Sequence, residues 1–442
     1  MKYFKIKHIA LLLAVTSAPL YTACDFMDCS ETDYYSKQQI LDNMDRVKQL
    51  ATQVYSYLPH DFCNTSGAMQ DAATDDAIHV YESSAIQRFV NGTWSANYTV
   101  NDVFGTYYNA IHDANFYLEN CVGLTFDEWK YSDGFADDYK SYLNYEHEVR
   151  FLRAFYYFNL VQCWGDVPLK LESTYSSGTV TDKDIARTDK NVIYKFIVKE
   201  MEEAADEGLL SAKDLGYKPN RISKSAAWGI LARVYLFWAG EHNRDDQPEP
   251  AEAKSYFERA SHFGQLVMGE GHDLSTNYWD VFIDMCSNKY NTSGKNESIW
   301  EAEFAGDGTG DVRSEGRIGN TIGLQCSDFS SQSSLVGKAD PGYSYGFLWS
   351  TPKLYNLYKS HGDMKRFTWN IAPFTYRALD SDADKDIKGK VGIVGRTFET
   401  EELYKVVTGS DWYESYDYEG ADDGTQFVSK GSQRGDVYKK QT

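Results

Sequence analysis

The sequence has no apolar run long enough to cross a bilayer, because a membrane-spanning helix needs about 20 largely apolar residues. The most apolar short segment, residues 9–15, reads IALLLAV and follows three lysines near the start of the chain. A basic start, a short apolar stretch and small residues are typical of a secretory signal peptide. We therefore expect residues 1–23 to be removed, and the mature protein to begin at Cys24 outside the cytoplasm.

Basic residues and closely paired cysteines are also scarce. The chain has 44 Lys and Arg against 65 Asp and Glu, and its formal net charge is −21. Because such a chain repels phosphate backbones and no segment forms a basic stripe, nucleic acid is not an expected partner. The seven cysteines are widely spaced and form no CxxC pair, which disfavours zinc-finger and thioredoxin-like chemistry. We expect Cys163, in an apolar helical segment, to be a buried core thiol.

The segment around Cys24 predicts a lipid anchor. A cysteine directly after Ala23 at the end of a signal peptide resembles a bacterial lipobox, in which the thiol receives a diacylglycerol. Tyr21 stands where leucine is usual in that motif. The alternative is ordinary signal cleavage beside an incidental cysteine. Residues 24–41 are acidic, and we expect them to form a tether.

Helical periodicity dominates the chain up to about residue 270. The strongest segment, 145–164, has two apolar stripes and a narrow polar edge of Arg150, Arg153 and Tyr157, so we expect this helix to be buried on most sides. Gly165 should end it, because glycine tolerates the left-handed conformation at a helix C-terminus. The other predicted helices are 42–58, 101–120, 223–240 and 251–268.

The segment after Ser223 predicts paired helices. Ser223 is a favourable N-cap residue, and the small side chains of Ala226, Ala227 and Gly229 allow a second helix to approach closely. Small residues at crossings and aromatics between helices are typical of tetratricopeptide-like packing, although no strict repeat is visible. An irregular helical bundle is the alternative. We predict a mainly α fold of such pairs, with long irregular loops and few short strands.

Four segments carry a family resemblance. They closely resemble the signature of the SusD/RagB family, and the dipeptides 346–347 and 351–352 are also similar to it. The segments are RFLRAFYYFNLV at 150–161, WGDVPL at 164–169, RISKSAA at 221–227 and NESIWE at 296–301.

The resemblance implies a cell-surface lipoprotein of Bacteroidetes outer membranes. Such a protein caps a TonB-dependent transporter of the SusC type and captures glycans or, in RagB-like members, peptides. It is not an enzyme and needs no cofactor. Family members continue for another helical stretch, so we expect this chain to be truncated at 442. The expected domains are the signal at 1–23, the tether at 24–41 and one body at 42–442, helical up to 270 and loop-rich at 271–442.

Candidate ligand-binding residues lie in two groups outside the strongest helices. An indole or phenol ring can stack on a sugar ring, and amides and carboxylates can bond its hydroxyls. The alternative is that the tryptophan is part of the core and the charged residues are solvated. The first group is Asp75, Asp76, Arg88, Trp94, Asn97 and Tyr98, and the second is Tyr343 and Tyr345 in a glycine-rich loop.

Motifs for catalysis or metal binding are incomplete. Residues 342–346 match GxSxG but lack the buried strand that a nucleophile elbow requires. Asp380, Asp382 and Asp384 have the spacing of a calcium loop, yet Lys385 stands where an EF-hand has glycine, so a solvated acidic loop is preferred. A surface glycoside hydrolase and a scaffold protein without a small ligand remain the alternative functions.

Overall fold

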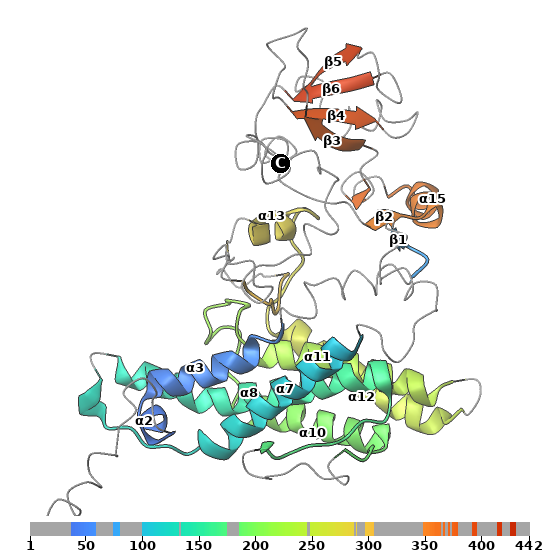
Figure 1. Ribbon diagram of the computed structural model, residues 1–442. Coiled ribbons are helices and arrows are strands. Elements are labelled where there is room, and N and C mark those ends of the chain that lie inside the picture. The colour runs from blue at the N-terminus through green and yellow to red at the C-terminus, as the bar shows by residue number, and fades with distance from the viewer. Residues whose placement is uncertain are drawn as a thin grey trace, which may run out of the picture.

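The computed structural model is mainly α-helical, with a few short strands (Figure 1). This confirms the predicted fold class. The residues that the structure describes are 37–58, 74–79, 100–131, 134–174, 185–244, 248–286, 289, 297–304, 348–363, 366, 370–371, 374–378, 391–395, 413–417 and 425–429.

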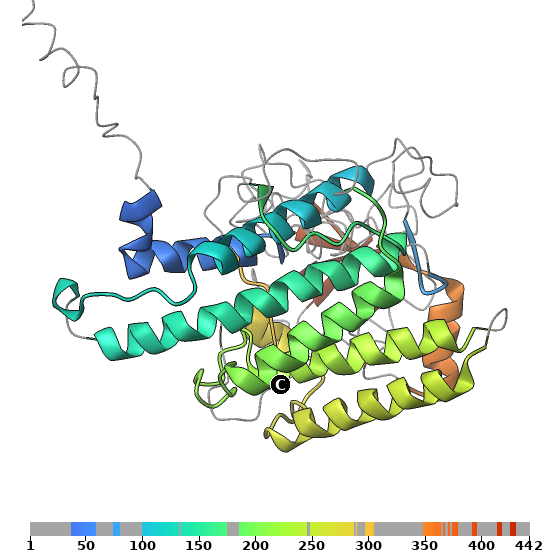
Figure 2. The same ribbon diagram turned by 90° about the horizontal axis from the view of Figure 1, so that it is seen from below.

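A layer of long helices forms the largest part of the described structure (Figures 1 and 2). Helix α8 is central and packs against α3, α7 and α10, while α11 packs against both α10 and α12. A short 3-10 helix, η2 (Glu128–Lys130), precedes α8. The helices are α2 (Lys37–Leu41), α3 (Met44–Tyr55), α7 (Val100–Asn120), α8 (Phe135–Trp164), α10 (Lys190–Glu207), α11 (Lys224–His242) and α12 (Pro250–Gly269).

The later part of the chain contributes shorter elements. Helices α13 (Asp280–Cys286) and α15 (Pro352–His361) are accompanied by a two-stranded sheet of β1 (Ala77–His79) and β2 (Leu348–Ser350). A separate antiparallel sheet has the strand order β3-β4-β6-β5. Its strands are β3 (Phe374–Ala378), β4 (Val391–Gly395), β5 (Tyr413–Asp417) and β6 (Thr425–Ser429).

Helix α8 is buried on more sides than its sequence pattern predicts. Arg153 and Tyr157, expected on a polar edge, are 9% and 0% exposed. That expectation is wrong because α10, a helix the sequence analysis did not predict, covers this edge and supplies Glu200 as a partner for Arg153. The predicted end of the helix is confirmed: Gly165 has φ 66° and its N–H donates to Val161.

The last turn of α8 corrects a second expectation. Cys163 is exposed rather than a core thiol. The neighbouring Trp164 takes the packing position instead, with its ring edge-on to Phe104 at 5.2 Å between centroids. One residue of helical rotation therefore decides which of the two side chains faces the core.

Helices α11 and α12 form the predicted close pair. The Ser223 side chain caps α11 by accepting a hydrogen bond from the Ala226 N–H at 3.2 Å. Trp238 stacks on Tyr256 with 3.9 Å between ring centroids, and Tyr235 stacks on Phe263 at 5.8 Å. Stacked aromatics thus fill the space between the two helices.

A fully buried carboxylate joins three parts of the bundle. Glu148 of α8 is 0% exposed and accepts a 2.5 Å hydrogen bond from the Tyr55 hydroxyl of α3. Its other oxygen accepts from Asn144 and from the Arg221 guanidinium. Tyr55 in turn accepts from the Ile222 N–H at 3.2 Å. Burial raises the pKa of the Glu148 carboxyl, and Arg221 is the largest influence opposing that rise.

A second ionic network ties α8 to α7 and α10. Arg153 donates to Asn115 at 2.9 Å and to Glu200 at 2.5 Å. Arg150, one turn earlier, donates to Glu203 at 2.6 Å. The two arginines of the segment 150–161 therefore hold neighbouring helices rather than a ligand.

The first prediction concerns the Glu148 network. Arg221→Ala should lower the free energy of unfolding by about 3 kcal/mol, because it leaves a buried charge without its cation. Urea denaturation followed by circular dichroism measures the loss. Lys199→Ala, which removes an exposed i,i+4 pair with Glu203, should cost less than about 1 kcal/mol. Equal losses in the two variants would contradict the role given to the network.

The second prediction uses Gly208, the residue that follows α10. A Cβ atom there would overlap the imidazole ring of His147, a half-buried side chain. Gly208→Ala should therefore destabilise the protein by about 1–3 kcal/mol, as overpacking does.

A double-mutant cycle isolates this clash. Adding His147→Ala should recover most of the loss, giving a coupling free energy above about 0.5 kcal/mol. Gly240→Ala is the control, because it lies within α11 with no atom within 4 Å of the added Cβ. That change should leave the protein at least as stable as before. Additive effects of the changes at positions 208 and 147 would refute the clash.

Candidate ligand-binding surface

Two of the predicted ligand-binding residues fall within the described structure. Asp75 and Asp76 are both exposed and directly precede β1. The roles of the remaining predicted positions stay predictions. Outside the described residues lie Arg88, Trp94, Asn97, Tyr98, Tyr343 and Tyr345, the expected lipid anchor Cys24, and the acidic loop of Asp380, Asp382 and Asp384.

Strands β1 and β2 bring together two segments that are far apart in sequence. They pair antiparallel, with Ala77 opposite Ser350 and His79 opposite Leu348. The Thr351 N–H donates to the Asp76 carbonyl at 2.9 Å, which extends the pairing by one residue.

Thr351 connects this sheet to the helix that follows it. Its hydroxyl donates to the Asp75 carbonyl at 2.5 Å and accepts from the Leu354 N–H at 3.3 Å. The second contact caps the N-terminus of α15. One side chain therefore fixes the start of α15 against the segment that carries the two predicted aspartates.

The direction of the pairing matters for the predicted site. Because β1 and β2 are antiparallel, the chain leaves β1 at His79 and enters β2 at Leu348 on the same end of the sheet. In the sequence, the group at 88–98 follows that end of β1. The group at 343–345 precedes that end of β2.

An exposed ion pair lies beside this sheet. Lys353 of α15 bonds the Asp75 carboxylate. This contact lowers the pKa of Asp75 and raises that of Lys353. Asp75 is therefore held in its ionised, hydrogen-bond-accepting form.

The structure also shows a cluster that the sequence analysis missed, here called the tyrosine–amide cluster: Tyr278, Tyr358 and Asn370. The Tyr278 hydroxyl donates to Asn370 Oδ1 at 3.1 Å, and the Asn370 amide donates to the Tyr358 hydroxyl at 2.9 Å. Phe282 lies edge-on to Tyr278 at 5.4 Å between centroids. The first bond joins residues 92 positions apart, so no local pattern could reveal it.

The cluster has the chemistry of a carbohydrate-binding surface. Phenol rings offer flat apolar faces to a sugar, and the amide and hydroxyls both donate and accept hydrogen bonds. Arg366, which is paired with Asp363, contributes a positive charge near the two tyrosines. Tyr358 belongs to α15, so the cluster and the β1–β2 sheet share this helix.

A shallow hollow of about 530 Å³ lies along α3. The described residues that line it carry amide, hydroxyl and charged groups and no aromatic ring, so this face lacks a stacking platform. They are Asp45, Lys48, Gln49, Thr52, Gln53 and Ser56.

Comparison with known proteins identifies the family. Residues 25–236 match the family model SusD-like_3, described as "Starch-binding associating with outer membrane". The chain belongs to the SusD-like family. The matched range contains the two ionic networks of α8. The segments that resemble the family at 150–161 and 221–227 therefore hold the helical scaffold together.

Two curated relatives and one solved structure illustrate the similarity. A SusD-like protein of Formosa agariphila is 27% identical over 225 residues, 50% of this chain and 35% of the relative. Starch-binding protein SusD of Bacteroides thetaiotaomicron is 25% identical over 240 residues, 54% of this chain and 37% of the relative. The matched region thus spans little more than a third of either relative.

The solved structure is a SusD homologue from Bacteroides thetaiotaomicron. It superposes with a TM-score of 0.63 at 22% identity, covering 79% of this chain and 63% of that one. This likeness supports the SusD-like fold. Among the helices that the structure describes, none combines the length and apolar character that crossing a bilayer requires.

The third prediction tests the contact that joins α15 to Asp75. In Lys353→Met the pKa of the Asp75 carboxyl should rise towards its ordinary value, because the ion pair and hydrogen bond that lower it are lost. NMR titration of the carboxyl carbon follows the change. In the parent chain, the ionised Asp75 carboxylate stabilises the folded pairing when the pH is above the ordinary pKa of aspartate. This stabilisation is lost as the pH falls through the lowered pKa of Asp75. An unchanged Asp75 pKa would show that the pair does not form in solution.

Proposed function

We propose that this SusD-like protein captures glycans at the cell surface and delivers them to a SusC-like TonB-dependent outer-membrane transporter. A lipid on Cys24 would hold it in the outer membrane, as the lipobox-like segment at 22–24 predicts. The proposal involves retention of the glycan without turnover, and it assigns no catalytic residue or cofactor.

The observation that carries the proposal is the antiparallel pairing of β1 with β2. It joins the segment at 75–79 to the segment at 348–353. In the sequence, the predicted group at 88–98 follows the first segment and the group at 343–345 precedes the second. Such convergence from distant segments is what a binding surface on a rigid scaffold needs. Asp75 and the tyrosine–amide cluster flank the same helix, α15.

The family supports the choice of ligand. The matching model describes starch binding and association with the outer membrane, and one relative is named a starch-binding protein. The surplus of aromatic residues, 15% of the chain, suits ring stacking on sugars. The sequence has a formal net charge of −21 and no segment that forms a basic stripe, so neutral polysaccharides fit better than polyanions.

The fourth prediction tests glycan capture. Residues 25–442, without the lipid, should retain labelled soluble polysaccharides such as starch, and the recovered glycan should keep its length. Trp94→Ala and Tyr278→Ala should each weaken retention by about 1–3 kcal/mol, the range expected when a stacking ring is removed. Affinity electrophoresis against a panel of polysaccharides measures the effect.

Trp129→Ala provides the matched control. Trp129 is 80% exposed in η2, and η2 adjoins the start of α3, where the Met44 N–H donates to Tyr131. Its removal should leave retention unchanged. Shortened glycan would point instead to a hydrolase. Retention of peptides alone would favour the RagB-like alternative, and copurification with the transporter tests the delivery step.

A further inference from the structure

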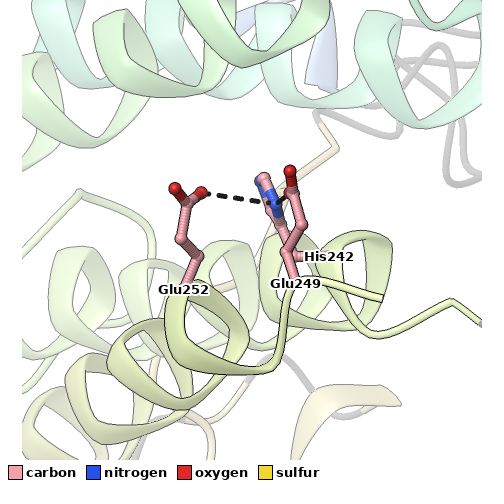
Figure 3. A group of neighbouring side chains, drawn as sticks. All are labelled: His242, Glu249 and Glu252. Atoms are coloured by element: carbon pink, nitrogen blue, oxygen red, sulfur yellow. Dashed lines mark hydrogen bonds and ion pairs between the residues drawn. The ribbon is translucent and has the colours of Figure 1, made fainter. Parts of the chain in front are cut away.

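The turn between α11 and α12 gathers three metal-ligating side chains (Figure 3). His242 lies in the last turn of α11, Glu249 directly precedes α12, and Glu252 lies in its first turn. The Nδ1 atom of His242 bonds Glu249 and lies 3.5 Å from Oε2 of Glu252. One ligand atom from each of the three lies within 4.8 Å of the others.

The imidazole is held in place before any ligand arrives. Its side chain is only 10% exposed and packs against the rings of Trp238 and Tyr256, at 5.9 and 5.4 Å between centroids. The Glu249 N–H donates to the His242 carbonyl at 2.7 Å, which fixes the two helix ends to each other. Nδ1 is therefore presented to the carboxylates from a rigid position.

The carboxylates can adjust around that fixed atom. Glu249 and Glu252 are 58% and 60% exposed, so solvent and ions reach both of them. Their spacing of three residues places them on one face at the start of α12. A buried, oriented histidine with two accessible carboxylates is a preorganised ligand set.

A simple ion pair does not balance this group. One imidazole N–H can donate a good hydrogen bond to only one carboxylate, and Nδ1 already bonds Glu249. Among the described residues, Glu252 has no other ion-pair partner. A divalent cation bound between the three side chains would neutralise both carboxylates at once.

The ligand types select the class of ion. Imidazole favours zinc and related transition metals over calcium and magnesium, which prefer oxygen alone. Tetrahedral zinc with bonds of about 2.0–2.2 Å places its ligands about 3.3–3.6 Å apart. The 3.5 Å between Nδ1 and the Glu252 oxygen matches this spacing.

We propose that His242, Glu249 and Glu252 bind one zinc ion, with water completing its coordination. The ion would clamp the end of α11 to the start of α12 and so stabilise this helical pair. The site is built from helix ends outside the candidate ligand-binding surface, and it is independent of glycan capture.

The experiment uses residues 25–442 freed of metal with a chelator. Isothermal titration with Zn²⁺ should give one tight site per chain. The affinity should fall at least tenfold in His242→Ala and in the double variant Glu249→Gln, Glu252→Gln. Glu258→Gln, an exposed change later in α12, should leave zinc binding unchanged. Ca²⁺ should bind this site much more weakly than Zn²⁺.

Thermal unfolding provides a second readout. Zn²⁺ should raise the Tm of the parent chain and of Glu258→Gln, but not that of the double glutamine variant. The double variant should fold because both side chains are exposed and neither caps α12. Zinc affinity retained in His242→Ala, equal affinity for Ca²⁺, or no stoichiometric zinc site in the parent chain would each overturn the proposal.

Discussion

The charge of Glu148 at the centre of the bundle constrains the rest of the scaffold. A carboxylate with no solvent contact must be compensated by protein groups, and here these come from α3, from α8 itself and from the chain just before α11. Those segments are fixed in one arrangement because only that arrangement satisfies the charge. The parallel network around Arg153 adds α7 and α10 to the same assembly. The motif that identifies the family is therefore an electrostatic framework for helix packing.

Much of the helical scaffold is predictable from sequence because it depends on local periodicity. Helices α3, α7, α11 and α12 lie where their apolar spacing indicates, and Ser223 caps α11 as expected. Helix α10 was missed, and with it the reason that Arg153 and Tyr157 are buried. A sequence pattern always counts arginine as polar. Only the position of Glu200 on α10 shows that Arg153 can be buried, because Glu200 pairs with its charge. Cys163 and Trp164 are adjacent on the helix, and only the packing against α7 determines that Trp164 faces the core while Cys163 is exposed.

The candidate binding surface depends on contacts that no local pattern encodes. The sequence singles out Asp75 and Asp76 as polar residues near an aromatic group, but not their pairing with the segment at 348–353. Tyr278, Tyr358 and Asn370 come from three separate segments, and each looks unremarkable in its own neighbourhood. The proposed zinc ligands are closer in sequence, with His242 seven positions before Glu249. Only the packing of α11 on α12 brings their side chains together. In each case the information lies in tertiary arrangement.

The β1–β2 sheet has a consequence for how the molecule folds and opens. Thr351 and Asp75 are 276 positions apart, so their contact closes a very long loop of chain. The entropy of that closure is small only after the intervening helices have formed, because a folded bundle shortens the effective loop. The sheet should therefore assemble last and open first, as a separate cooperative unit whose amides exchange with solvent while the bundle remains protected. The candidate ligand-binding surface would then rest on a contact that opens before the helical bundle does.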